Sequence, residues 1–292
     1  MKSKQDYLRM LFGEPKAREE NSVLDRIQNT APPPLVFSGV NIEDILEGQT
    51  FEDTNSKGLK NALQQALDYV GEEGYIPNMR ELISAKIIAD KSHDFWKKWY
   101  SVHTEENIGI DTQGLYKKGE EIVLIINGGG IWTPDRIQKS YNDGLIDGSG
   151  KIHPNEWNDL LKGKLPNGKS LNQIYTYDEI YKGISNLPHQ YGVVVPYSMV
   201  KNLKSGQVKK KDFLKNPLVI ARNGGLENLE KYYEMASDSD GLGCYHPFDG
   251  RSASTPQGRV LFLNYGYGGL GGSYSLDNNG RFVGVGVGDA KR

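Results

Sequence analysis

Residues 121–130, EIVLIINGGG, carry the clearest structural signal in the sequence. Its apolar run from Ile122 to Ile126 is unbroken, which is typical of a strand covered on both faces, as in a parallel sheet. Asn127 and three glycines follow, and Thr133 with Pro134 then begins a helix, because a threonine caps well and a proline suits the first turn. The stretch therefore predicts a strand, a tight turn and a helix.

A second stretch, PLVIARNGG (residues 217–225), repeats this order. Residues 217–221 are predicted to form another buried strand, and a helix is expected from Leu226 to Tyr233. Glycines allow a ligand to approach the backbone, and the start of a helix offers free N–H groups with partial positive charge. In a parallel sheet both turns would lie at the carboxyl ends of their strands, where α/β folds bind ligands.

We therefore expect the two turns to bind a small anionic ligand that bears phosphate or carboxylate, with Arg222 as its charge partner. The alternative is that the glycines only make tight turns, since neither stretch matches the phosphate-loop or dinucleotide-binding pattern. The candidate ligand-binding residues are Asn127, Gly128, Gly129, Gly130, Arg222, Asn223, Gly224 and Gly225.

Other segments support an α/β fold with a mostly parallel central sheet. Residues 192–195 predict another buried strand, and residues 59–70 carry apolar side chains at helical spacing. Asn78 with Glu81, and Thr176 with Glu179, match the capping box that begins a helix.

The chain is expected to divide into a flexible arm, residues 1–57, and a single α/β domain, residues 58–292. Within the domain we expect a helical layer over residues 58–103 and an α/β core over residues 104–236. Residues 237–292 are predicted to form an antiparallel, glycine-rich β extension that contains a hairpin turning at residues 277–280. The polar arm is a candidate for docking to a protein partner.

Composition limits the classes of function. The 292 residues carry a formal net charge of -2, which does not favour nucleic acid as a partner. One cysteine excludes an intrachain disulfide and a cysteine zinc cluster. No apolar run approaches the roughly 18 residues that span a bilayer, and no apolar segment typical of a secretion signal follows the first residues. We therefore expect a cytoplasmic protein without a membrane partner.

Two further patterns bear on chemistry. Residues 145–156 resemble a calcium-binding loop, but Leu145 stands at the first ligand position, where a carboxylate is needed, so no metal site is predicted. Cys244 and His246 share one side of an extended segment and form a candidate catalytic pair. The sequence indicates no particular cofactor. Three functions stay open: a binder of small anions, a non-catalytic interaction or assembly protein, and a cysteine-dependent enzyme.

Overall fold

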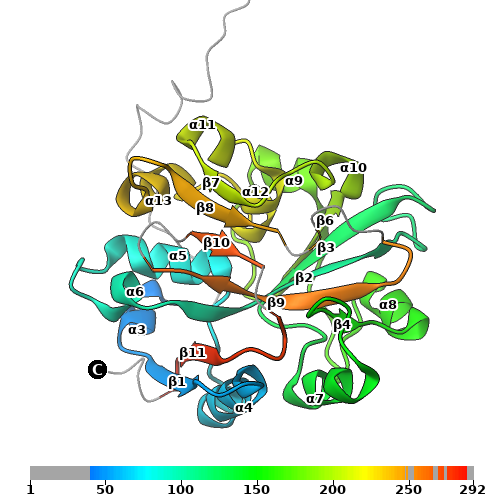
Figure 1. Ribbon diagram of the computed structural model, residues 1–292, viewed down its shortest axis with the longest axis horizontal. Helices are drawn as coiled ribbons and strands as arrows, with labels where there is room; N and C mark the ends of the chain where they lie inside the picture. Colours follow the sequence, from blue (N-terminus) through cyan, green and yellow to red (C-terminus); the bar gives the residue numbers. More distant parts are fainter. Residues whose placement is uncertain (1–39, 247, 249–252, 266–268, 273–274, 288–292) are drawn as a thin grey trace, which may run out of the picture. The chain divides into compact units, whose positions relative to one another are not determined.

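The computed structural model describes residues 40–246, 248, 253–265, 269–272 and 275–287 (Figure 1). These residues belong to one compact unit, Phe37–Arg292. Residues 1–39, the larger part of the predicted arm, lie outside the described residues.

The described residues form a nine-stranded sheet with the order β5-β6-β3-β2-β9-β10-β8-β7, and β4 pairs with β9 beside this path. The strands at its centre are long, whereas those toward its two edges have two to six residues. The bounds are β5 Ile174–Thr176, β6 Tyr191–Pro196, β3 Glu121–Asn127, β2 Tyr100–Ile110, β9 Gln257–Leu263, β10 Leu270–Gly271, β8 Leu242–Tyr245, β7 Gly206–Val208 and β4 Gly150–Lys151.

The sheet is mixed, so the expectation of a mostly parallel sheet is wrong. The central pairs β6–β3, β3–β2 and β2–β9 are all antiparallel. Parallel pairing joins β5 to β6 and β10 to β8. The unbroken apolar run of β3 indicates cover on both faces, and antiparallel strands can be covered in the same way when helices lie on each side.

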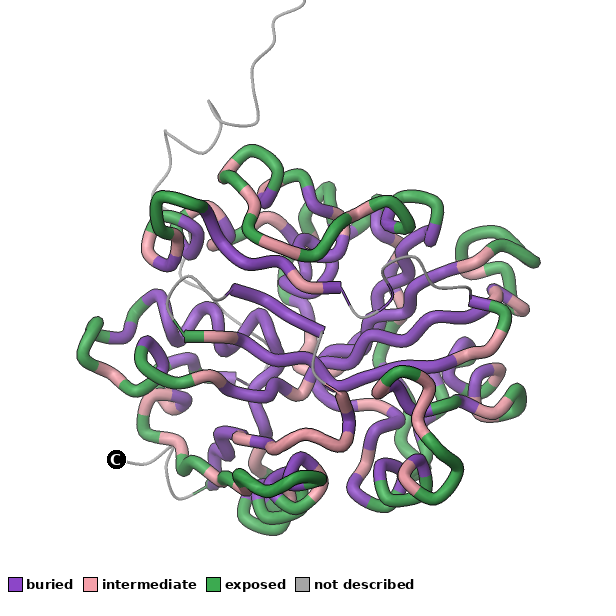
Figure 2. Tube along the Cα trace, viewed as in Figure 1, coloured by how far each residue is buried: buried purple, intermediate pink, exposed green. Residues whose placement is uncertain are grey.

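Helices cover both faces of the central strands. Ile122, Leu124 and Ile126 on one face of β3 belong to a core cluster with side chains of α4, α7 and α8, whereas α10 and α12 contact β3 from the other side. Figure 1 shows α7 and α8 below these strands and α9, α10 and α12 above them, and Figure 2 shows the strands buried between them. The bounds are α4 Gly58–Val70, α7 Pro134–Asp143, α8 Pro154–Leu161, α9 Tyr177–Lys182, α10 Tyr197–Val200 and α12 Pro217–Arg222.

Residues 217–221, predicted as a strand, form helix α12. Asn216 Oδ1 accepts hydrogen bonds from the N–H groups of Leu218 and Val219, at 3.0 and 3.3 Å. Pro217 occupies the first turn. A short apolar run fits a buried helix as well as a buried strand, and here the cap and the proline at its start decide for the helix.

The predicted C-terminal hairpin is wrong, because its two strands lie in different sheets. Strand β11 (Gly280–Gly284) pairs antiparallel with β1 (Gln49–Asp53), whereas β9 lies in the main sheet. Residues 40–57, assigned to the arm by sequence, therefore carry helix α3 (Ile42–Leu46) and strand β1.

The predicted capping boxes are both present. Asn78 with Glu81 begins α5, and Thr176 with Glu179 begins α9. Both first turns therefore have partners for their N–H groups. The other helices of the described residues are α5 Met79–Ile88, α6 Asp94–Lys97, α11 Lys210–Phe213 and α13 Leu229–Ala236.

Candidate functional site

The first Asn-Gly-Gly turn follows β3, and hydrogen bonds with His103 and Gln190 hold its backbone. The N–H groups of Gly128 and Gly129 both donate to the His103 carbonyl oxygen, at 2.8 and 2.9 Å. The Gln190 side chain donates to the carbonyl oxygens of the same two glycines, at 3.2 and 2.8 Å. Both glycines have positive φ, 80° and 85°, so this path suits glycine.

The next three N–H groups of this turn bind a carboxylate of the chain itself. Gly130, Ile131 and Trp132 donate to the Glu105 carboxylate at 3.1, 3.0 and 2.8 Å. This is the arrangement that the sequence predicts for an external anion, with Glu105 as the anion. Burial raises the pKa of the Glu105 carboxyl to about 7, although these N–H groups and Asn107 act in the opposite direction.

The second Asn-Gly-Gly turn is held by an ion pair. Arg222 is fully buried, and its Nε donates to Glu106 Oε2 at 2.8 Å while Nη2 donates to the Tyr245 carbonyl oxygen at 3.0 Å. The Asn223 side chain donates to the carbonyl oxygens of Gly225 and Glu227, at 3.0 and 2.7 Å. Arg222 therefore neutralises a buried glutamate in this structure.

The two turns lie on opposite faces of the sheet. Glu105 and Glu106 are consecutive residues of β2, paired with Ile126 and Ile125 of β3. Successive side chains of a strand point to opposite faces, so each glutamate contacts the turn on its own face. The predicted site residues are thus divided between two places.

A pocket of about 320 Å³ lies beside the first turn. One wall is apolar and comes from α4, and the other combines the glycine turn with polar side chains from β2 and from residues 167–190. Its lining residues include Leu63, Leu67, Val70, Trp132, His103, Gly128, Gly129, Gly130, Asn167, Lys169, His189 and Gln190, with Glu72 and Tyr75 at the end of α4.

The His189 side chain lines this pocket and is held by a buried carboxylate. Its Nδ1 donates to the buried Glu81 carboxylate, 2.8 Å from Oε1 and 3.0 Å from Oε2. Its carbonyl oxygen accepts from Asn78 Nδ2 at 3.0 Å. Burial alone would lower the pKa of His189, but the charge of Glu81 and its hydrogen bond raise it above the ordinary value. The capping box of α5 thus also orients this imidazole.

His103 lies next to His189 and has the opposite electrostatic character. Burial, and the charge of His189, lower the pKa of His103 to about 3, so its imidazole is neutral at pH 7. The glycines make room for both histidines. A Cβ on Gly129 would lie 2.3 Å from the His103 ring, and one on Gly128 would lie 2.5 Å from the His189 carbonyl oxygen.

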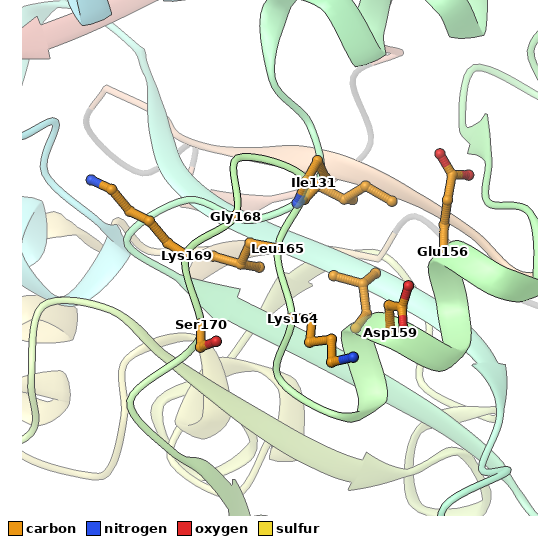
Figure 3. Close-up of a pocket in the computed structure, with 10 residues that line it drawn as sticks. Ile131, Glu156, Asp159, Lys164, Leu165, Gly168, Lys169 and Ser170 are labelled. Carbon is orange, nitrogen blue, oxygen red and sulfur yellow. The ribbon is translucent and has the colours of Figure 1, made fainter.

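A second pocket, of about 400 Å³, is lined mainly by α8 and by the loop over residues 164–170. Figure 3 shows Glu156 and Asp159 on its α8 side and the Lys169 side chain directed away from them. Lys169 lines both pockets. The Glu156 carboxylate is already bound by Arg136, whose Nε lies 2.9 Å from Oε1. The pocket beside the first turn is therefore the better candidate site.

The calcium-loop pattern and the Cys244–His246 pair were the other two candidates, and the structure shows the surroundings of both. Glu156, in the loop over residues 145–156, pairs with Arg136, and Ser149 Oγ accepts from Arg259 Nε at 2.7 Å. Among the described residues, no group of three or more His, Cys, Asp or Glu side chains could hold a metal ion.

Cys244 is buried in β8, and burial raises the pKa of its thiol to about 12. Burial lowers the pKa of the neighbouring His246 to about 3. A nucleophilic cysteine needs a thiolate, which this environment opposes at neutral pH.

Sequence reasoning missed the histidines and the two glutamates of β2. His103 and His189 lack the spacing of a metal motif and lie 86 positions apart in the sequence. The available signal was the capping box, because Glu81 at its third position is the residue that holds His189. Nothing local marks Glu105 as the partner of a turn 25 residues later.

Comparisons with known proteins identify a fold. No protein-family model and no curated protein matches the chain. Among solved structures, it resembles a protein reported for the accommodation of massive sequence variation in Nanoarchaeota by the C-type lectin fold. The TM-score is 0.58 at 23% sequence identity, and the match covers 81% of this chain and 96% of that one. The likeness shows a C-type lectin-like fold. In the part of the chain that the structure describes, no helix is long and apolar enough to cross a membrane.

Proposed function

We propose that this protein binds a small phosphate- or carboxylate-bearing molecule in the pocket between α4 and the first glycine turn. The observation that carries this proposal is the convergence of His103, His189 and Lys169 on one pocket that faces an apolar wall. Pockets of this composition hold small ligands, because apolar walls supply contact area and a few polar groups fix orientation.

The role of the glycines in this proposal differs from the one that the sequence suggests. Their N–H groups are bound to His103 and Glu105, so they do not serve as donors to the ligand. Gly128 instead lets the His189 main chain lie against the turn, and Gly129 makes room for the His103 imidazole. The positive groups on this pocket are then Lys169 and, when protonated, His189.

The experiment is calorimetric titration of the full chain with sulfate, methylphosphonate and acetate at low ionic strength. Lys169→Ala should weaken binding about tenfold, or ~1.4 kcal/mol, through loss of one charged contact. Lys164→Ala is the matched control, because Lys164 lines only the second of the two pockets described above. If none of the anions binds saturably, or if both substitutions weaken binding equally, the proposal is wrong.

The fold itself favours a second candidate, a non-catalytic interaction protein. In the Nanoarchaeota protein, the C-type lectin fold accommodates massive sequence variation. A scaffold of that kind would leave the histidine pocket without a ligand. Absence of anion binding, together with a stable complex of this chain with itself or a partner in sedimentation, would favour the second candidate.

A further inference from the structure

We infer that His189 receives the anionic group of the ligand in its doubly protonated form, and that Glu81 is the positioning residue that keeps it in that form. This inference rests on the proposed function and adds to it the charge state that the site must adopt.

The geometry leaves one ring nitrogen of His189 for the ligand. A carboxylate only accepts hydrogen bonds, so Nδ1 must be the donor in both contacts with Glu81. Nε2 is then the remaining polar atom of the ring, and His189 lines the pocket. When Nε2 also carries a proton, it is a charged donor, and charge-assisted hydrogen bonds are about twice as strong as neutral ones.

Glu81 is fixed by contacts that do not involve the pocket. It is 1% exposed, and its Oε2 accepts the Asn78 N–H at 2.9 Å in the capping box of α5. The same Asn78 side chain holds the His189 main chain. One helix start therefore fixes both the carboxylate and the backbone of the imidazole that it polarises.

Three titratable groups near His189 carry no charge at neutral pH: Tyr75, His103 and Tyr191. Tyr75 meets the His189 ring edge-on at 5.4 Å, and burial raises its pKa. His103 is neutral because its pKa is about 3. Tyr191 lies near Glu81, and burial raises its pKa as well. Among the described lining residues, the other acidic or basic side chains are Lys169 and Glu72.

The sign of the pH dependence follows from this arrangement. Glu81 raises the pKa of His189 above 6.5, so the imidazolium is present below that raised value and is lost as the pH rises through it. Affinity for an anion of fixed charge should therefore be constant on the acid side of this pKa. It should fall up to tenfold per pH unit on the alkaline side until only the contribution of Lys169 is left.

Sulfate is the probe for the test, because its charge does not change between pH 5.5 and 8.5. Calorimetry on the full chain across this range compares the unchanged protein with three variants. Glu81→Gln preserves the capping-box geometry, since glutamine also serves at that position, and it removes the charge. His189→Gln removes the titrating group, and Lys169→Ala removes the lysine charge of the pocket.

We expect the affinity of Glu81→Gln to begin falling at a lower pH than that of the unchanged protein and to approach it as the pH is lowered. His189→Gln should bind weakly with no pH dependence, and Lys169→Ala should lie below the unchanged protein by a constant factor at pH values where His189 stays protonated. A flat profile in the unchanged protein, with saturable binding, overturns this inference and leaves the proposed function intact. Loss of all saturable binding overturns both.

A second measurement does not depend on the variants folding. The ¹⁵N shifts of the His189 ring in the full chain, titrated with and without sulfate, report its protonation directly. We expect a pKa above 6.5 that rises further with sulfate. A value below 6.5, or one that sulfate does not move, contradicts the inference.

Discussion

The two Asn-Gly-Gly turns have the same three residues and different structures. The first follows a strand and surrounds the Glu105 carboxylate with three backbone N–H groups. The second follows a helix, and its preceding residue, Arg222, forms a buried ion pair with Glu106. One turn thus binds a carboxyl group through main-chain N–H groups, and the other supplies a positive side chain.

This difference shows that a short glycine motif does not define a binding site. In each turn a glutamate of β2 already binds groups that were predicted to meet an external ligand, Glu105 at the first turn and Glu106 at the second. What distinguishes the first turn is the adjoining pocket, where His103 and His189 lie against the glycines. The binding proposal therefore concerns the pocket beside the turn and not the turn itself.

The largest expected effect is on the second turn. Arg222→Ala leaves the fully buried Glu106 without its counter-charge, and we expect a loss of about 3–5 kcal/mol in the free energy of unfolding. Urea denaturation measures it, with Lys215→Ala, an exposed lysine, as the control. A loss below ~1 kcal/mol would mean that Arg222 is not committed to this pair, and it would return as a candidate cation for a ligand.

A smaller loss is expected at the first turn. Glu105→Gln places an amide NH₂ against backbone N–H donors, which should cost about 3 kcal/mol at pH 5. Burial raises the pKa of Glu105 from 4.5 to about 7, so ionising it disfavours the folded state as the pH rises through this range. The advantage of glutamate over glutamine should therefore shrink by roughly 2 kcal/mol between pH 5 and pH 8.

Urea denaturation at both pH values tests this expectation, with exposed Glu73→Gln as the control. If the difference between Glu105 and the glutamine variant does not change with pH, the carboxyl is ionised throughout. The bonds from the N–H groups would then outweigh burial.

The third effect concerns His246, on the same face of the sheet as the second turn. Here stability depends on pH in the opposite direction. Burial, with Arg222 nearby, lowers the pKa of His246 from 6.5 to about 3, so the unfolded chain gains a proton that the folded chain does not. Stability should therefore fall on acidification, by roughly 2 kcal/mol between pH 7 and pH 5 from this residue alone. In the His246→Phe variant the fall in stability between pH 7 and pH 5, measured by urea denaturation, should be smaller by this amount. Equal falls in both proteins would show that His246 protonates in the folded state.

Local signals predicted the elements better than their arrangement. The strand at residues 121–126 and the capping boxes of α5 and α9 are confirmed, because each depends on a few adjacent residues. The apolar run at residues 217–221 was assigned to the wrong element, since periodicity alone cannot separate a short buried helix from a strand. Asn216 with Pro217 was the signal that could have corrected it.

Strand direction and pairing depend on contacts between distant residues. The apolar pattern of β3 shows burial on both faces, but does not show that its neighbours β2 and β6 run antiparallel to it. Strand β11 pairs with β1, more than 220 residues earlier, and no turn residue encodes that partner. The histidine pocket likewise brings together residues from positions 63 to 190, so no motif could contain it.

The adjacent glutamates of β2 also bear on how the sheet can assemble. A slip of β2 by one residue would turn Glu105 toward the face of Arg222 and Glu106 toward the N–H groups of the first turn, with Thr104 and Asn107 displaced as well. Each carboxylate would then be displaced along the strand from the groups that could bind it. One or both would be buried without a hydrogen-bond or charge partner. The two glutamates therefore raise the free energy of a sheet in which β2 is paired out of register, and so help to set the register of the central strands.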